Sequence, residues 1–186
     1  QLLDYAINAS LVLSYVAMRK DDKAGLVTFN EYLDTFVPAS KQVGQMQTLL
    51  ENLYKQETTF GETDFSALCG HLGKHVNKRS FLVLYTNFSN MTSLNRQLVY
   101  LQQLARQHRV LVVFFEDADL KEYIAGKSVT TEEYYRHVIA EKFAFEKRLI
   151  VSTLKQHGIY SLLTTPDKLS IDVINKYLEM KSRQLL

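Results

Sequence analysis

Apolar residues recur along the chain in two different patterns. Near the start, Leu3, Ile7 and Leu11 repeat at the spacing of one helix face, whereas residues 81–85 and 110–115 are apolar at every position. The first pattern predicts an amphipathic helix. A short, continuous apolar run predicts a strand that is covered on both faces. The chain therefore combines amphipathic helices with buried strands.

The same patterns extend over most of the sequence. They predict helices over residues 3–18, 43–54, 65–76, 94–108, 119–125, 131–156 and 170–178. They predict strands over residues 26–29, 31–37, 81–85, 110–115 and 159–163. Strands that alternate with long helices indicate crossover connections between parallel strands. We therefore expect an α/β fold with an open, mostly parallel, Rossmann-like sheet and helices on both faces.

Local signals refine the ends of three elements. Pro38 is expected to end the second strand, because proline cannot donate a hydrogen bond to a neighbouring strand. Asp64 has the position of a helix N-cap before residue 65, and Thr92 or Ser93 is expected to cap the helix that follows the strand 81–85.

Composition limits the class of protein. The chain has 186 residues, of which 46% are hydrophobic, enough for one globular domain with a core. It shows no internal repeat and no Gly/Ser linker, so we expect a single domain over residues 1–186. A net charge of +2 gives no reason to expect a nucleic-acid partner. No apolar run reaches the ~18 residues of a membrane span. The single cysteine, Cys69, fits a reducing compartment, which favours the cytoplasm.

The beginning of the sequence is unusual, because Gln1 leads directly into a helical pattern without a cap or a loop. We therefore expect the sequence to be an N-terminally incomplete part of a longer protein.

Candidate binding residues follow the predicted strands. In open α/β sheets, ligands lie outside the carboxyl ends of the strands. Polar residues stand at four such positions, namely 30–31, 86–89, 116–119 and 164–165, and the loop 58–64 can reach the same edge. The sequence therefore points to this edge of the sheet as the functional region.

The largest group of carboxylates follows the strand 110–115. Glu116, Asp117 and Asp119 offer the hard oxygen ligands that Mg²⁺ or Ca²⁺ accepts. A metal-dependent hydrolase that uses this cluster and a bound water is therefore one alternative function. Capping of a short helix by Asp119 is the more ordinary interpretation of the same spacing.

Three further positions carry weaker signals. Thr63 and Asp64 combine a hydroxyl and a carboxylate, which suits a hard cation as well as a helix cap. His71 and His75 lie four residues apart on a predicted helix, but the glutamate of a HExxH zinc motif is replaced by Leu72. Cys69 lies between apolar helical residues, where a small buried role is the usual one.

Five segments, in order along the chain, carry a resemblance to a known family. They are LDYAINA at 3–9, DKAGLVTF at 22–29, ETDFSAL at 62–68, KRSFLVLYTN at 78–87 and VINKYLE at 173–179. Together they resemble the DUF58 family of bacterial proteins, whose core is similar to a von Willebrand factor A domain. The resemblance extends over essentially the whole chain.

The resemblance implies a metal-dependent adhesion site at the carboxyl edge of the sheet. Thr63 matches the threonine of such a site, and Asn87 stands where its aspartate would be. The DxSxS segment of the family would precede Gln1. An amide oxygen brings no negative charge, so we expect this chain to bind Mg²⁺ weakly or not at all. For the intact protein, Mg²⁺ stays a candidate cofactor. The residues expected to contact a partner are Thr63, Asp64, Thr86, Asn87 and Asp117.

The resemblance also implies that the central first strand of the sheet precedes this sequence. Without that strand, residues 26–29 and 81–85 would each have an open edge, and open edges invite pairing with another chain. We expect a homodimer, aggregation or an added strand as the consequence.

The function that the resemblance implies is protein–protein interaction without catalysis. Family members resemble adaptors of MoxR-type AAA+ ATPases, so such an ATPase is the expected partner. Relatives often carry membrane spans upstream, so the full-length protein is a candidate for membrane anchoring even though this segment has no expected contact with a membrane.

Overall fold

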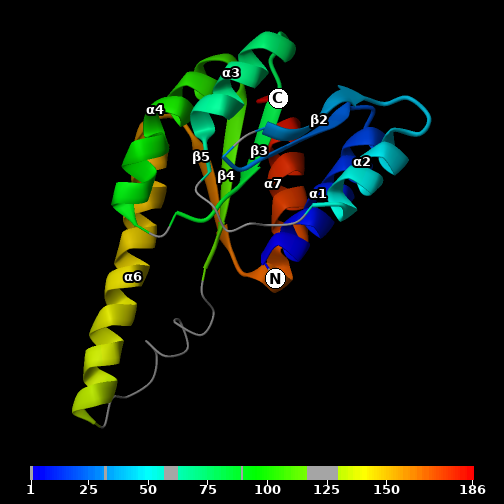
Figure 1. Cartoon of the computed structure of the whole chain (residues 1–186). Helices are drawn as coiled ribbons and strands as arrows, with labels where there is room; N and C mark the ends of the chain where they lie inside the picture. Colours follow the sequence, from blue (N-terminus) through cyan, green and yellow to red (C-terminus); the bar gives the residue numbers. More distant parts are fainter. Residues whose placement is uncertain (1, 32, 57–62, 89, 117–129) are drawn as a thin grey trace. The chain divides into compact units, whose positions relative to one another are not determined.

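A computed structural model describes residues 2–31, 33–56, 63–88, 90–116 and 130–186. The chain divides into two compact units (Figure 1). Unit 1 contains Gln1–Ser80 and Asp167–Leu186, and unit 2 contains Phe81–Pro166. The expectation of a single domain over residues 1–186 stays a prediction.

Unit 1 combines a two-stranded antiparallel sheet with four helices. The sheet pairs β1 (Ala24–Phe29) with β2 (Leu33–Ser40). The helices are α1 (Leu2–Arg19), α2 (Gln45–Tyr54), α3 (Phe65–His75) and α7 (Leu169–Ser182), the last of which follows a short 3₁₀ turn, η1 (Pro166–Lys168). Helix α1 packs against both α7 and α2 (Figure 1).

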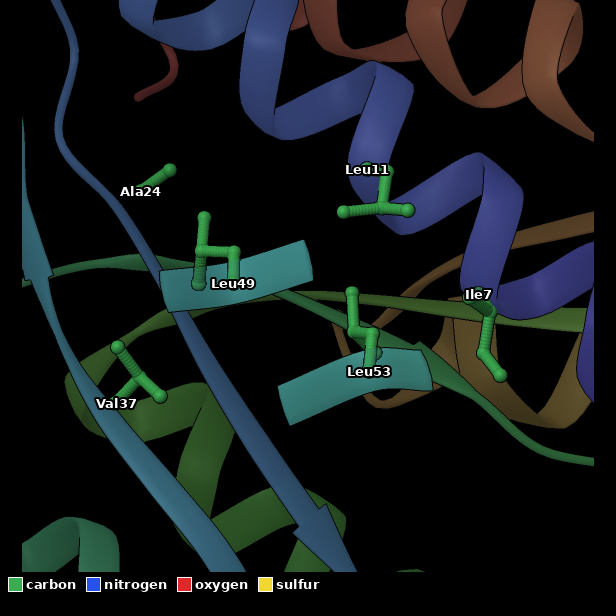
Figure 2. Close-up of a cluster of buried hydrophobic side chains, with 6 residues drawn as sticks. All are labelled: Ile7, Leu11, Ala24, Val37, Leu49 and Leu53. Carbon is green, nitrogen blue, oxygen red and sulfur yellow. The ribbon is translucent and has the colours of Figure 1, made fainter. Parts of the chain in front are cut away.

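The core of unit 1 is formed by aliphatic side chains from α1, α2 and the two strands. Figure 2 shows six of them gathered in one cluster: Ile7, Leu11, Ala24, Val37, Leu49 and Leu53. Leu49 is only 1% exposed. Burial of side chains of this size stabilises a fold by about 1.5–3 kcal/mol each, so this cluster accounts for the docking of α1 and α2 on the hairpin.

Pro38 does not end the second strand, contrary to the expectation from the sequence. Strand β2 continues to Ser40, and Pro38 lies at an irregularity between the pairs Leu26–Val37 and Ala24–Ser40, where two residues face Gly25 alone. A β-bulge of this kind tolerates a residue that cannot donate a ladder hydrogen bond. Gly25 is required opposite it, because a Cβ atom there would lie 2.7 Å from the Val37 carbonyl oxygen.

The turn between α1 and β1 is fastened to α7 by charged hydrogen bonds within unit 1. The Lys181 ammonium donates to Asp22 Oδ2 at 2.5 Å and to the Lys20 carbonyl oxygen at 3.1 Å, and the Tyr177 hydroxyl donates to the same carboxylate oxygen. Although burial alone would raise the pKa of Asp22, hydrogen bonds from Lys181 and Tyr177 hold it below its ordinary value. Burial and the bond to Asp22 raise the pKa of Tyr177.

In its described residues, unit 2 is a three-stranded parallel sheet with two long helices. Strand β4 (Arg109–Phe115) lies between β3 (Phe81–Tyr85) and β5 (Tyr160–Thr164). Helix α4 (Met91–Gln107) connects β3 to β4, and α6 (Thr131–Gln156) precedes β5 and contacts both β5 and α4. Figure 1 shows the three strands running side by side with α4 and α6 packed along them. In β4, Leu111, Val112 and Phe114 are fully buried, as the continuous apolar run predicts.

The fold class predicted from the sequence is confirmed: the protein has an α/β, Rossmann-like fold with helices that flank a parallel sheet. Within the described part of the chain, β1 pairs with β2 alone and β3 pairs with β4 alone. Dimerisation through these edges stays a prediction. The expected short helix at residues 119–125 lies outside the described residues.

Candidate functional site

Polar residues meet at the carboxyl edge of the unit 2 sheet, because its three strands are parallel. The hydrogen-bond ladder continues one residue beyond β3 and β4: the Thr86 amide donates to the Val113 carbonyl oxygen at 3.0 Å, and the Glu116 amide donates to the Thr164 carbonyl oxygen at 2.9 Å. Thr86 and Glu116 are therefore held by the sheet itself, and Asn87 follows as the first residue beyond it.

The side chain of Asn87 receives a hydrogen bond from a lysine of α6. The Lys147 ammonium donates to Asn87 Oδ1 at 2.9 Å and to the Phe88 carbonyl oxygen at 2.8 Å. It also lies over the ring of Phe114, 5.4 Å from the ring centroid, which is within the range of a cation–π contact. Burial lowers the pKa of Lys147, because desolvation disfavours the charged ammonium. A partly buried cation thus lies beside Asn87, next to the carboxyl end of β3.

The neighbouring residue of α6 binds the other end of the same loop. Glu146 accepts a hydrogen bond from the Met91 amide at 2.9 Å, at the N-terminus of α4, where a carboxylate is favoured by the helix dipole. The N-cap of α4 is Asn90, whose Oδ1 accepts from the Ser93 amide at 2.9 Å, rather than Thr92 or Ser93 as the sequence suggested. Helix α6 therefore binds Asn87 and Phe88 after β3 through Lys147, and binds Met91 at the start of α4 through Glu146.

Thr63 and Asp64, the other predicted metal and binding residues, belong to unit 1. Asp64 is the N-cap of α3: its Oδ1 accepts from the Ser66 amide at 2.7 Å and from the Ala67 amide at 3.2 Å. Its own amide donates to the Asn30 carbonyl oxygen at 2.7 Å, which ties the start of α3 to the end of β1. The capping interpretation of Asp64 is confirmed, and Thr63 is exposed beside it.

The predicted site residues therefore fall into separate groups. Thr86 and Asn87 lie together in unit 2, and Thr63 and Asp64 lie together in unit 1. Asp117 and Asp119 lie outside the described residues, so of the proposed carboxylate cluster only Glu116 is described. The residues that the structure describes include no group of three or more His, Cys, Asp or Glu side chains that could hold a metal ion.

The two histidines of α3 stack on each other. The rings of His71 and His75 lie 4.0 Å apart at 17°, and the ring of Phe36 from β2 meets His71 edge-on at 4.6 Å. His71 Nε2 is buried and has no hydrogen-bond partner. Burial, followed by the charges of His75 and Lys74, lowers the pKa of His71. These contacts give the pair a packing role against β2.

Cys69 is buried in α3, and burial together with the charge of Asp64 raises the pKa of its thiol to about 11. The thiol is therefore protonated at neutral pH, which leaves it a poor nucleophile and a poor metal ligand.

Among the described helices, none combines the length and the apolar character that crossing a bilayer requires.

Comparison with known proteins identifies the family. A family model described as "Protein of unknown function DUF58" matches residues 3–127, more than half of the chain. The chain belongs to the DUF58 family. No curated protein and no solved structure matches it. The matched region of this DUF58 chain includes Asn87 and ends before α6, so the lysine that binds Asn87 lies outside the part that the family model covers.

Lys147 is the site residue that sequence reasoning missed. It stands 60 positions after Asn87, and its own neighbourhood on α6 alternates charged and apolar residues in the manner of a solvated helix. A signal was nevertheless present, since the DUF58 resemblance put an amide where a carboxylate was expected. An amide in the place of an expected carboxylate could have prompted a search for a neighbouring cation of the chain itself.

Proposed function

We propose that this DUF58 protein is a non-enzymatic protein-interaction module, an adaptor for a MoxR-type AAA+ ATPase, that contacts its partner through the carboxyl edge of the unit 2 sheet. Its site is a degenerate form of a von Willebrand factor A-like metal site. The observation that carries the proposal is the pair of hydrogen bonds from Lys147 to Asn87 Oδ1 and to the Phe88 carbonyl oxygen.

These bonds support binding without a metal. In a metal-dependent adhesion site, a divalent ion offers positive charge to the partner. Here an ammonium of the chain itself lies against the side chain that would otherwise be a metal ligand. A cation as close as 2.9 Å to Asn87 Oδ1 would repel a divalent ion that approached the same oxygen. The proposal therefore includes no Mg²⁺ in this chain. It also takes the interaction to be cytoplasmic, for which the support is the single cysteine, Cys69, and the reducing compartment that it favours.

The same contacts favour binding over catalysis. Lys147 and Glu146 both engage the loop that follows β3, so their role is to hold its shape. The alternative of a metal-dependent hydrolase gains no support, because Asp117 and Asp119 lie outside the described residues.

The test is a pull-down of the ATPase by the immobilised chain, with Asn87→Ala compared against Asn95→Ala. Asn95 is exposed on α4 and has no hydrogen bond to Lys147, so Asn95→Ala makes the same chemical change at a position outside the proposed site. We expect Asn87→Ala to weaken capture at least about tenfold, the effect of losing one or two good polar contacts, and Asn95→Ala to leave it unchanged. Equal capture by both variants would remove the basis of the proposal.

The metal part is tested on the chain alone, because the ATPase itself uses Mg²⁺. Calorimetric titration with MgCl₂ should give no binding heat. Saturable binding that Asn87→Ala abolishes would show instead that the edge is a metal site.

A further inference from the structure

Lys147 is a partly buried cation whose ammonium has two hydrogen-bond acceptors in the part of the chain that the structure describes. A lysine ammonium carries three N–H bonds. Two of them go to neutral oxygens, the Asn87 amide oxygen at 2.9 Å and the Phe88 carbonyl oxygen at 2.8 Å. The ring of Phe114 covers another side of the charge. Among the described residues the third N–H bond has no acceptor, which leaves it for a ligand at the carboxyl edge of the sheet.

No carboxylate balances this charge within the described part of the chain. The ion pairs of the described residues join other partners and leave Lys147 out. The closest acidic residue in sequence, Glu146, uses its carboxylate for the Met91 amide. A charge that is removed from water is costly unless it is paired, so a counter-charge that binds here gains more than one that binds an exposed lysine.

We infer that an aspartate or glutamate side chain of the protein partner supplies this counter-charge and accepts the third N–H bond of Lys147 beside Asn87. The inference rests on the proposed function and names the chemistry of the partner: an acidic segment whose carboxylate takes the place that a metal-bound carboxylate has in a metal-dependent site.

The surroundings of the ammonium favour a carboxylate over a phosphate. Asn87 Oδ1 and the Phe88 carbonyl oxygen are both acceptors, and they lie against the same ammonium. They repel a phosphate group of charge about −1.5 to −2 more strongly than a carboxylate of charge −1. One free N–H bond also matches a single carboxylate oxygen, whereas phosphate sites usually combine several donors.

The decisive variant is Asn87→Asp, which offers Lys147 a carboxylate from its own chain. If the partner's carboxylate binds there, the new carboxylate at position 87 neutralises the Lys147 ammonium first and competes with the partner for it. Asn95→Asp on α4 is the matched control, because it changes the net charge equally at an exposed position. Lys147→Met, compared with Lys142→Met at an exposed position of the same helix, is a second and independent pair.

The probe is hexaglutamate, with hexaglutamine and inorganic phosphate as comparison ligands. Binding is followed by the NMR signal of the Lys147 Cε atom in the labelled chain. We expect hexaglutamate to shift this signal saturably, Asn87→Asp to weaken binding at least tenfold, and Asn95→Asp to leave it unchanged. In the second pair, peptide binding measured by calorimetry should fall at least tenfold in Lys147→Met and stay unchanged in Lys142→Met.

Three results would overturn the inference: no response of Lys147 to hexaglutamate, an equal response to phosphate or hexaglutamine, or full binding by Asn87→Asp. Failure of the proposed function looks different. If the ATPase binds the wild-type chain and Asn87→Asp equally well, the adaptor function stands and the role of Lys147 falls. If hexaglutamate binds at Lys147 but the ATPase is not captured, the carboxylate site stands and the choice of partner falls.

Discussion

Two lysines, one in each unit, make similar contacts, but only one of them donates to a carboxylate among the described residues. In unit 1, Lys181 donates to a backbone carbonyl oxygen and to Asp22, and it lies 5.9 Å from the centroid of the Tyr177 ring. In unit 2, Lys147 donates to a backbone carbonyl oxygen and to Asn87, and it lies 5.4 Å from the centroid of the Phe114 ring. The main difference is a carboxylate in one place and an amide in the other.

In our proposal, this difference separates a structural contact from a binding site. The charge of Lys181 is neutralised within the fold, where it fastens α7 to the turn that follows α1. The charge of Lys147 is oriented by two hydrogen bonds but not neutralised by the described residues. An oriented and unneutralised charge at a sheet edge is suited to attract a partner, whereas a neutralised one is suited to hold the fold together.

The largest effect on stability is expected from Lys181→Met. The change leaves the partly buried Asp22 carboxylate without its cation, and we expect the free energy of unfolding to fall by about 1–2 kcal/mol, between the values for exposed and buried ion pairs. Lys147→Met removes a cation that has no paired carboxylate among the described residues, and it should cost less than about 1 kcal/mol. Urea denaturation of both variants measures the two losses in free energy of unfolding. Equal losses would contradict the distinction between the two lysines.

A smaller effect of the opposite sign is expected from Asn87→Asp. It creates in unit 2 the ion pair that unit 1 already has, so the free energy of unfolding should rise by about 0.5–1 kcal/mol. The same denaturation experiment, with Asn95→Asp as the control, measures it. A destabilised Asn87→Asp chain would mean that the charge of Lys147 is already balanced.

The two lysines should also differ in the pH at which they matter. Lys147 has a lowered pKa in the folded state, so at neutral pH its burial costs stability, and this cost is relieved as the pH rises through the folded pKa toward the unfolded value. The wild-type chain should therefore gain stability relative to Lys147→Met as the pH rises from neutrality toward the unfolded value of about 10.4. Denaturation of both chains across this range measures the difference.

In unit 1 the corresponding group is Asp22, whose folded pKa is lowered. Its contribution is present above the unfolded pKa of about 3.9 and is lost as the pH falls through the lower folded value. Asp22→Asn should flatten this acid limb of the stability curve. A limb of unchanged steepness would show that the bonds from Lys181 and Tyr177 do not favour the ionised carboxylate.

The smallest effect on stability is expected from His71. Its titration makes unit 1 sensitive to acid in a higher pH range than that of Asp22. Its folded pKa is lowered, so below the unfolded value of about 6.5 the unfolded chain binds more protons and stability falls with falling pH. His71→Phe keeps a ring against Phe36 and should weaken the loss of stability between about pH 6.5 and pH 5. Thermal unfolding at these two values measures it, and an unchanged loss would assign the effect to other groups.

The fold could be predicted from the sequence to a large extent, because its signals are local. Continuous apolar runs marked β3 and β4, and the position of Asp64 marked the start of α3. Pro38 was misjudged because its tolerance depends on Gly25 in the partner strand, which a single segment does not reveal. The cap of α4 was placed two or three residues late, because Asn90, Thr92 and Ser93 are all suitable residues and the choice is made by backbone geometry.

Only part of the candidate site, the residues that follow β3, could be predicted from the sequence. The rule for strand ends selected Thr86 and Asn87, since it depends on the order of elements alone. Lys147 could not be selected in the same way, because its contact with Asn87 depends on how α6 packs along the sheet and on which face of that helix turns inward. Asp117, which the same rule selected, lies outside the described residues, and its predicted role stays a prediction.

The most direct test of the account is the pKa of Lys147 in the free chain, measured by NMR titration of its side-chain carbon signals. The account predicts a value below that of an ordinary lysine, and a rise toward the ordinary value in Asn87→Asp. A value at or above that of an ordinary lysine in the wild-type chain would contradict it, because the ammonium would then already have its counter-charge and would need none from a partner.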